Sequence, residues 1–265
     1  MTDLIKELFR RNAILSWVAL GHFLLLIVLA AISLFDSTTI LGINRWIKPM
    51  KFSASIGLYA TTIAWFTGYL PKEKLSVKLI SWGIAICMIA EIVCIVLQPA
   101  RGTTSHFNKA TPFDAVVFSI MGTMIAINTV LDAFLLALFF KEKTAIPRSY
   151  LWGIRLGLAV FIIASLEGFM MILHLSHSVG IADGGAGLPF VNWSTEGGDL
   201  RVAHFFGMHA LQALPIAGYV FHMLSKKRSL TNPVAWTLGF AVLYAAVGLL
   251  LFLQAINGRP LYAGL

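Results

Sequence analysis

Long runs of apolar residues alternate with short polar segments along the whole chain. A helix needs about 20 residues to cross the hydrocarbon core of a bilayer, which is roughly 30 Å thick. Seven runs have this length, and they predict membrane-spanning helices over residues 13–35, 50–70, 79–99, 114–140, 150–175, 201–224 and 233–255. The pattern therefore predicts an all-α integral membrane protein, a seven-transmembrane-helix bundle that forms a single domain over residues 1–265.

The composition supports a membrane protein. Hydrophobic residues make up 58% of the chain and charged residues only 12%, whereas soluble domains carry about 25% charged residues. The mean hydropathy is +0.82. The first apolar run, from Ala13 to Phe35, is longer than the apolar region of a signal peptide, which has roughly 7–15 residues. We therefore interpret this run as the first membrane-spanning helix.

The net charge of +8 is distributed unevenly between the two sides of the predicted bundle. The larger basic set, on the N-terminal side, is Lys6, Arg10, Arg11, Lys72, Lys74, Lys78, Lys141, Lys143, Arg148, Lys226, Lys227 and Arg228. The smaller set, on the opposite side, is Arg45, Lys48, Lys51, Arg101, Lys109, Arg201 and Arg259. Because basic loops stay cytoplasmic, this bias predicts a cytoplasmic N-terminus and an extracytoplasmic C-terminus, in a bacterial inner membrane. We expect a lipid bilayer, and no nucleic acid, as the partner.

The segments on the predicted outer side are longer than the basic loops on the inner side. They cover residues 35–49, 99–113 and 176–200, and we expect them to form an outer cap. Loops longer than about a dozen residues are usually functional or disordered, and the aromatic Trp193 favours a folded cap. Asp199 is expected to cap the helix that follows it, because aspartate is a preferred N-cap residue.

Polar side chains recur at spacings of three and four within the predicted spans, which places them on one helical face. The stripe in the third span is Cys87, Glu91, Cys94 and Gln98, and the stripe in the fifth is Glu167, Met171, His174 and Ser178. Charged groups within membranes usually face a bundle interior or a wet cavity, so Glu91 and Glu167 are candidate catalytic acids or bases. In the inner half, Asp132 and Arg155 are expected to form a structural ion pair, with a proton relay as the alternative.

Histidines are concentrated near the outer ends of the fifth and sixth spans, and four of them are candidate metal ligands: His174, His177, His204 and His209. His174 and His177 are three residues apart, so both are expected to approach one metal ion from the same helical face. Imidazole together with a carboxylate from Glu167 or Glu91 suits zinc, iron or copper. A metal-bound water would then be the nucleophile, and the spare glutamate would be the base.

A second arrangement would hold haem b between histidines of two helices, such as His22 and His209, or His174 and His204. Four outer groups are candidates for binding an anionic substrate: Arg101, His106, Arg201 and Gln212. Neither HExxH nor CxxCH occurs in the chain, so no motif decides between metal and haem. A polar pocket without a metal, or histidines that only hydrogen-bond neighbouring helices, also fit the sequence.

Together these patterns predict a membrane-embedded enzyme, an oxidoreductase or hydrolase, with a histidine and carboxylate site in the outer half of the bundle. Its cofactor would be a metal ion or haem. The alternative is a non-enzymatic transporter or sensor whose outer-facing pocket takes a small polar ligand or ion. A gated inner pathway past Asp132 would favour transport, and a sealed inner half would favour a site confined to the outer side.

Overall fold

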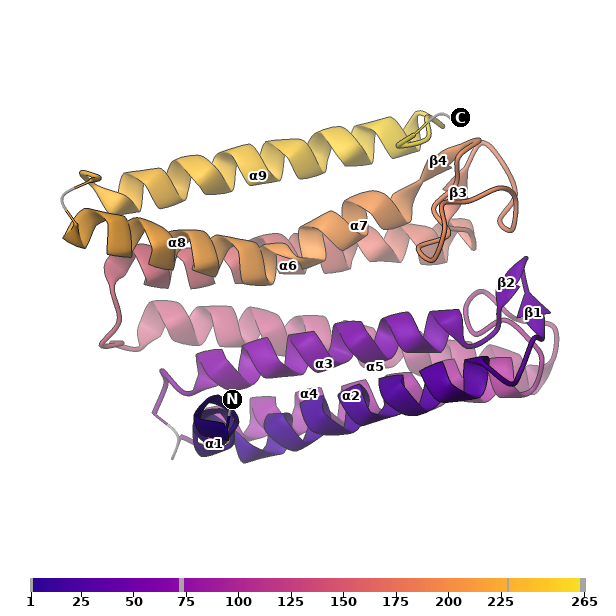
Figure 1. The fold of residues 1–265 in the computed structure, drawn as a ribbon, viewed down its shortest axis with the longest axis horizontal. Helices are drawn as coiled ribbons and strands as arrows, with labels where there is room; N and C mark the ends of the chain where they lie inside the picture. Colours follow the sequence, from indigo (N-terminus) through magenta and orange to yellow (C-terminus); the bar gives the residue numbers. More distant parts are fainter. Residues whose placement is uncertain (1, 72–73, 228, 263–265) are drawn as a thin grey trace. The chain divides into compact units, whose positions relative to one another are not determined.

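A computed structural model describes residues 2–71, 74–227 and 229–262 of the chain, and most of these residues are helical. The helices group into two compact units, Met1–Leu131 and Asp132–Leu265, and each is described by itself. The boundary falls inside one long helix, α5 (Pro112–Lys141), which contributes its first part to unit 1 and its last turns to unit 2. The helices can be followed in Figure 1.

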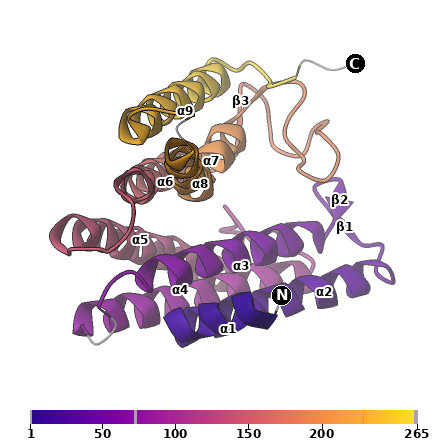
Figure 2. The same cartoon turned by 60° about the vertical axis from the view of Figure 1, so that its left-hand side comes forward.

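Unit 1 consists of long helices that lie side by side and one small hairpin (Figures 1 and 2). Its elements before α5 are α1 (Thr2–Arg11), α2 (Ala13–Ser33), β1 (Thr39–Ile40), β2 (Ile43–Asn44), α3 (Ile47–Thr67) and α4 (Leu75–Ala100). The strands β1 and β2 are antiparallel, with Ile40 opposite Ile43. The helices α2, α3 and α4 pack against one another, and their core contains the fully buried Leu15, Ile63, Ile84 and Ile95.

Asn12 connects these three helices at the end of unit 1 where α2 begins. Its side-chain oxygen accepts a hydrogen bond from the Leu15 backbone N–H at 3.1 Å and so caps α2. Its amide donates to the hydroxyls of Thr67 on α3, at 3.0 Å, and Ser81 on α4, at 2.7 Å. Residues 12, 67 and 81 therefore lie at one height in unit 1, and α2 and α4 both run away from that level.

Unit 2 contains the last turns of α5 and, among the described residues, four further helices and two short strands. Its elements after α5 are α6 (Arg148–His174), β3 (Ser178–Val179), β4 (Gly198–Asp199), α7 (Leu200–Met208), α8 (Ala210–Lys226) and α9 (Pro233–Ile256). The helix α6 packs closely against α7 and α8, and α9 packs against all three (Figure 2). A Cβ atom at Gly153 of α6 would lie 2.5 Å from the Leu214 carbonyl oxygen, so only glycine permits this approach. Such small residues are a common means of helix packing in membranes.

Five of the described helices are long and apolar enough to cross a membrane, namely α2, α4, α5, α6 and α9. All five coincide with predicted spans, so the chain is a multi-pass integral membrane protein. The predicted span at 50–70 corresponds to α3, which is less apolar and carries Lys48 and Lys51 near its start. The predicted span at 201–224 is interrupted at His209, and each of its two parts, α7 and α8, is too short to be counted alone.

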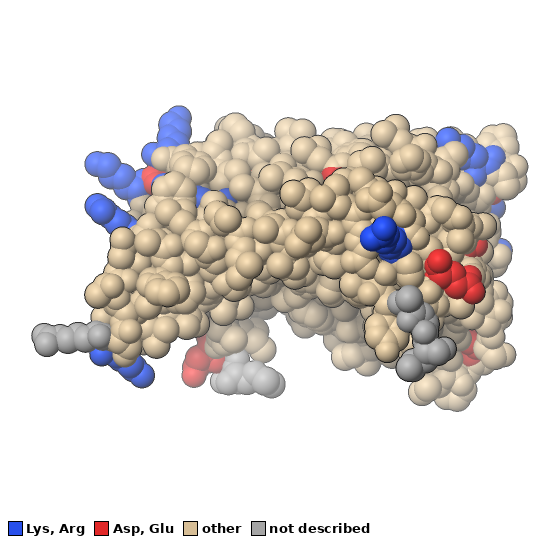
Figure 3. Space-filling view, turned by 90° about the horizontal axis from the view of Figure 1, so that it is seen from above, with Lys and Arg blue, Asp and Glu red and all other residues tan. Residues whose placement is uncertain are grey.

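The helix α9 presents the clearest lipid-facing surface of unit 2. It contains no charged residue, and Val242 and Leu250 are 71% and 65% exposed. On the side of the molecule that α9 covers, lysine and arginine gather toward the ends of the helices, and few charged side chains lie between them (Figure 3). This distribution is typical of a surface that contacts lipid tails in its middle and headgroups or water at its ends.

Candidate functional site

Glu167 on α6 and His204 on α7 are two predicted site residues that meet across helices in unit 2. The distance between Glu167 Oε2 and His204 Nδ1 is 3.3 Å, and the side chains are 13% and 30% exposed, respectively. His204 Nδ1 also lies 2.9 Å from the carbonyl oxygen of Ala164, to which it donates. Because both acceptors lie on the Nδ1 side of the ring, Nε2 is the nitrogen available to a ligand or proton.

Both carboxylate oxygens of Glu167 are buried without a hydrogen-bond partner among the residues that the structure describes. The 3.3 Å approach to His204 is therefore a close contact rather than a hydrogen bond, since the Nδ1 proton is directed at Ala164. A buried carboxylate without hydrogen bonds is costly unless it is protonated, paired or contacted by a ligand. Glu167 is therefore the strongest candidate in unit 2 for binding a proton or a polar group.

Gly168, the residue after Glu167, allows the imidazole of His204 to lie against α6. A Cβ atom at this position would be 2.8 Å from His204 Cε1, closer than real Cβ contacts. Any larger residue at 168 would displace the ring. Because Glu167 and Gly168 are adjacent on α6, the carboxylate lies next to the position that the His204 ring occupies.

The helix that carries His204 is interrupted close to this pair. His209 lies between the end of α7 at Met208 and the start of α8 at Ala210. Its Nδ1 is 3.4 Å from Gln212 Oε1, so these two residues share a face. The backbone N–H of His209 donates to the carbonyl oxygen of Phe205 at 3.2 Å, and its carbonyl accepts from Ala213 at 3.0 Å, so the helical hydrogen bonding continues through the interruption.

The prediction that His174 and His177 share one helical face is wrong. The helix α6 ends at His174, and Leu175 takes a left-handed φ of 51° that turns the chain away. His174 is exposed, and His177 lies in the following loop with its Nδ1 2.7 Å from Asp183 Oδ2. In the described ranges, no group of three or more His, Cys, Asp or Glu side chains could hold a metal ion. The predicted metal site therefore gains no support.

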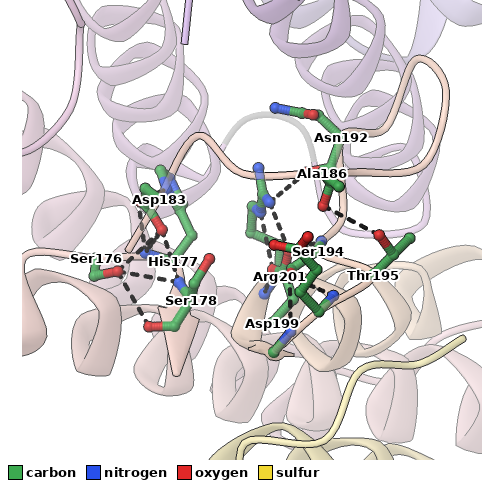
Figure 4. A network of polar contacts seen from close by, with 12 residues as sticks. Ser176, His177, Ser178, Asp183, Ala186, Asn192, Ser194, Thr195, Asp199 and Arg201 are labelled. Carbon is green, nitrogen blue, oxygen red and sulfur yellow. Dashed lines mark hydrogen bonds and ion pairs between the residues drawn. The ribbon is translucent and has the colours of Figure 1, made fainter. Parts of the chain in front are cut away.

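Asp183 orders the segment that follows α6 (Figure 4). Its carboxylate accepts hydrogen bonds from the hydroxyl of Ser176 at 3.0 Å, from the backbone N–H of His177 at 3.0 Å and from that of Ser178 at 2.9 Å. Burial acts to raise the pKa of Asp183, but the hydrogen bonds and charge of His177 outweigh burial and hold the pKa well below its ordinary range. His177 is thus part of a structural network in the loop.

Asp199 caps α7, as predicted, because its Oδ1 accepts a hydrogen bond from the Arg201 backbone N–H at 3.0 Å. The other oxygen, Oδ2, accepts from the backbone N–H of Ser194 at 2.8 Å (Figure 4). The guanidinium of Arg201 donates to both oxygens of Asp199 and to the carbonyl oxygen of Asn192. The charge of Arg201, a predicted substrate-binding group, is therefore neutralised by the buried cap residue.

Arg101 in unit 1 is paired in the same way. Its Nη1 donates to Asp114 Oδ1 at 2.7 Å, and Asp114, 3% exposed, also accepts hydrogen bonds from Gln98 at 2.9 Å and Thr111 at 2.7 Å. The nearby His106 contacts the Ser105 hydroxyl through Nδ1 at 3.0 Å. Both arginines that were predicted to bind an anionic substrate are thus already engaged by an aspartate.

Glu91 is a second buried carboxylate of unit 1. The predicted stripe on α4 faces inward, and Glu91 is 3% exposed. Its Oε2 has no hydrogen-bond partner within the described part of the chain, while the positive charge of Lys48 on α3 acts on the carboxylate. Two further buried atoms, Nε2 of His22 and Oγ of Ser53, share this lack of a partner. Three unsatisfied polar atoms therefore lie on the inner faces of α2, α3 and α4.

His22 and Glu91 lie at the same height in unit 1. Asn12 and Ser81 are hydrogen-bonded, and His22 and Glu91 each lie the same number of residues further along α2 and α4. The Nδ1 of His22 donates to the carbonyl oxygen of Val18, one turn earlier on its own helix, at 2.7 Å. In the neutral ring, Nε2 is then an acceptor. Unit 1 thus places a second histidine and a second glutamate on neighbouring helices.

The expected ion pair between Asp132 and Arg155 is replaced by other contacts of Arg155. The guanidinium donates from Nε and Nη2 to the carbonyl oxygen of Phe139, at 3.1 and 2.8 Å. It also lies over the rings of Phe140 and Trp152, 4.5 and 5.2 Å from their centroids. Phe139 is in the last turn of α5, where carbonyl groups have no partner within the helix, and this explains its affinity for a guanidinium.

Three polar residues that contribute to these sites were missed in the sequence, namely Asp114, Asp183 and Ser53. Asp114 follows Thr111 by three residues at a helix start, a capping arrangement that the sequence does display. Asp183 precedes a glycine-rich turn, but its partners are fixed only by the fold. The predicted haem pair His22 and His209 belongs to different units, and each residue is described only within its own unit.

Comparison of the chain with protein-family models, with curated proteins and with solved structures finds no match. The two buried glutamates and their surroundings are therefore the features of the chain that indicate a function.

Proposed function

We propose that the protein crosses a bacterial inner membrane seven times, with the N-terminus in the cytoplasm. The helix α3 has 21 residues, about 31 Å at 1.5 Å per residue, which is enough to span the hydrocarbon core. The segments α7 and α8 follow each other with only His209 between them and together reach a similar length. The excess of basic residues on the N-terminal side supports the orientation.

Reporter tags at the two ends of the chain test this topology. With an odd number of spans, a tag at the N-terminus should be protected from an external protease in intact cells, and a tag at the C-terminus should be cleaved. Protection or cleavage of both tags would show an even number of spans and contradict the proposal.

We propose further that the protein is a transporter or sensor that binds a small polar ligand or ion from the outer side. Binding would be coupled to the protonation of Glu167. The observation that carries this proposal is the pair of buried, unsatisfied carboxylate oxygens of Glu167, 3.3 Å from His204. A proton or a ligand donor satisfies these oxygens, whereas an empty ionised site is costly in a medium of low polarity.

The surroundings of Glu167 support reversible binding. His204 is 30% exposed, so a group from outside can reach the pair without unfolding the helices. The interruption at His209, on the same segment as His204, is a position at which the helix can bend. Buried ionisable groups in membrane proteins are commonly part of ion or proton pathways.

Proton movement into vesicles that contain the purified protein tests this function. Under an imposed pH gradient, a trapped pH-sensitive dye should report faster proton entry with the wild type than with empty vesicles. The variant Glu167→Gln should abolish the difference, and the matched control Glu196→Gln, which changes an exposed loop glutamate, should preserve it. Equal rates for wild type and Glu167→Gln, or a wild-type rate no faster than that of empty vesicles, would reject a role for Glu167 in transport.

A membrane-embedded enzyme is the second candidate, and the orientation of His204 favours it. The Nδ1 of the ring donates to the carbonyl oxygen of Ala164, so Nε2 is the nitrogen that would act as a general base, with Glu167 beside the ring. An absorption spectrum and elemental analysis of the protein purified without chelators test the metal- and haem-dependent forms. A haem band or stoichiometric metal that is lost in His204→Ala would favour the enzyme.

A further inference from the structure

The N-terminal helix α1 is strongly amphipathic, although it is too short and too charged to cross a membrane. Its apolar side is formed by Leu4, Ile5, Leu8 and Phe9. Its polar side is formed by Asp3, Lys6, Glu7, Arg10 and Arg11. An apolar face opposite a charged face is the pattern of a helix that lies at the boundary between water and lipid.

Arg11 fixes α1 to unit 1. Its guanidinium lies over the rings of Trp65 and Tyr69, 4.0 and 4.5 Å from their centroids, and donates to the carbonyl oxygen of Trp65 at 3.1 Å. Its Nε also donates to Glu7 Oε1 at 2.8 Å, and this contact connects two turns of α1. Since Trp65 belongs to α3, the position of α1 is set by the bundle and not only by the chain that follows it.

The orientation of α1 follows from the arrangement within unit 1. Figure 1 shows α1 nearly end-on, beside the start of α2, whereas α2, α3 and α4 run lengthwise across the view. The aromatic ring of Phe9 contacts that of Trp17 on α2, with 5.0 Å between the centroids. If α2 spans the membrane, α1 therefore lies across the end of the bundle, along the membrane surface.

The apolar side of α1 is only partly covered by unit 1. Leu4 is 62% exposed and Ile5 is 51% exposed, while Lys6 and Arg10 are exposed on the charged side. One residue separates the end of α1 from the start of α2, at the end of unit 1 where α2 would enter the bilayer. Membrane lipid is the apolar medium present at this point. Arg10 is paired with Glu7 at 2.6 Å, so the exposed Lys6 is the cation of this side that suits a phosphate-bearing headgroup.

We propose that α1 is an interfacial helix that binds the lipid surface, with Leu4 and Ile5 inserted at the boundary between headgroups and acyl chains. Lys6 and Arg10 lie at the level of the headgroup phosphates. Arg11 holds the helix in this plane through its contacts with Trp65 and Tyr69. This surface is independent of Glu167 and its ligand.

Spin labels on the full-length protein test this placement. The two native cysteines, Cys87 and Cys94, are buried and are replaced by alanine in the parent variant. A single label is then introduced by Ile5→Cys or, as the matched control on the charged side, by Lys6→Cys. The variants are reconstituted in vesicles of phosphatidylethanolamine and phosphatidylglycerol, and collisions with oxygen and with a water-soluble nickel complex are compared.

The label at position 5 should collide preferentially with oxygen, and the label at position 6 preferentially with the nickel complex. Equal access of the nickel complex to both positions would place α1 in water and overturn the proposal, and exclusion of both reagents from position 5 would show a protein contact and overturn it as well. Adding Arg11→Ala should increase the mobility of both labels. Unchanged mobility would contradict the role of Arg11 in fixing the helix.

Discussion

Each unit buries a glutamate on one helix and carries a histidine on a neighbouring helix, but the surroundings of these groups differ between the units. In unit 2, Glu167 and His204 approach within 3.3 Å and remain partly exposed, at 13% and 30%. In unit 1, Glu91 and His22 are 3% and 4% exposed, and His22 bonds to its own helix through Val18. The comparison teaches that the pair in unit 2 is open to an external ligand, whereas the groups in unit 1 depend on internal neighbours.

Replacing His22 and His204 by alanine should give the largest difference in stability between the two units. His22→Ala removes a buried ring from the core of unit 1 and should lower the free energy of unfolding by about 2 kcal/mol, through the cavity and the lost hydrogen bond. His204→Ala should lower it by about 1 kcal/mol, because that ring is partly exposed. Equilibrium unfolding in mixed detergent micelles measures both changes.

The control for these variants is Gly122→Ala, since a Cβ atom at Gly122 meets no other atom within 4 Å. This change should leave the stability unchanged or raise it by up to about 1 kcal/mol through helix propensity. A loss for His204→Ala that equals or exceeds the loss for His22→Ala would show that the exposed pair is the more important structural contact.

Replacing Asp183, in the loop after α6, should have a smaller and pH-dependent effect on stability. Because the folded-state pKa of Asp183 lies below its ordinary value of 3.8, the ionised carboxylate stabilises the loop above that pH. The stabilisation is lost as the pH falls below this value toward the folded-state pKa. Asp183→Asn should lower the free energy of opening of this loop by about 1 kcal/mol. Proteolysis of residues 176–199 should then be about fivefold faster at neutral pH.

Cleavage of this loop, followed by mass spectrometry, measures the effect of Asp183→Asn at neutral pH, and Glu196→Gln in the same segment is the control. The variant Asp183→Asn should be cleaved faster than the control Glu196→Gln. If Glu196→Gln accelerated cleavage as much as Asp183→Asn, the hydrogen bonds from Ser176, His177 and Ser178 would not be what orders the loop.

Double-mutant cycles should give the smallest effect and the sharpest contrast between the units. The pair Glu167→Gln and His204→Ala should show a coupling energy of about 0.5 kcal/mol, because the two side chains interact directly. The pair Glu91→Gln and His22→Ala should be additive within about 0.3 kcal/mol, because each side chain has its own neighbours. Stronger coupling in unit 1 than in unit 2 would reverse our interpretation of the two sites.

Local patterns in the sequence predicted the helices and several of their faces correctly. The stripe of Cys87, Glu91, Cys94 and Gln98 is buried, as its spacing predicts. Asp199 caps α7, because capping depends only on residues next to it in the chain. The helix α1 was missed because a search for long apolar runs does not detect a short helix in which charged and apolar residues alternate.

Predictions that depended on where a helix ends or on which charges pair were less successful. His174 and His177 were assigned to one helical face, but the left-handed backbone at Leu175 ends α6 between them. Arg101 and Arg201 looked available for an anion, whereas Asp114 and Asp199 engage them. These partners are close in sequence, but the fold decides whether a charge is buried and therefore which contact it makes.

The sequence by itself determined the class of this protein, because hydrophobicity and helical periodicity are properties of neighbouring residues. It marked the membrane-spanning helices, the polar stripes and the glutamates that carry the candidate chemistry. Only the tertiary structure decided that His204, rather than His174 or His177, lies beside Glu167, since this contact requires α6 and α7 to approach closely at Gly168. Such an approach depends on side chains far apart in the chain, and no local pattern encodes it.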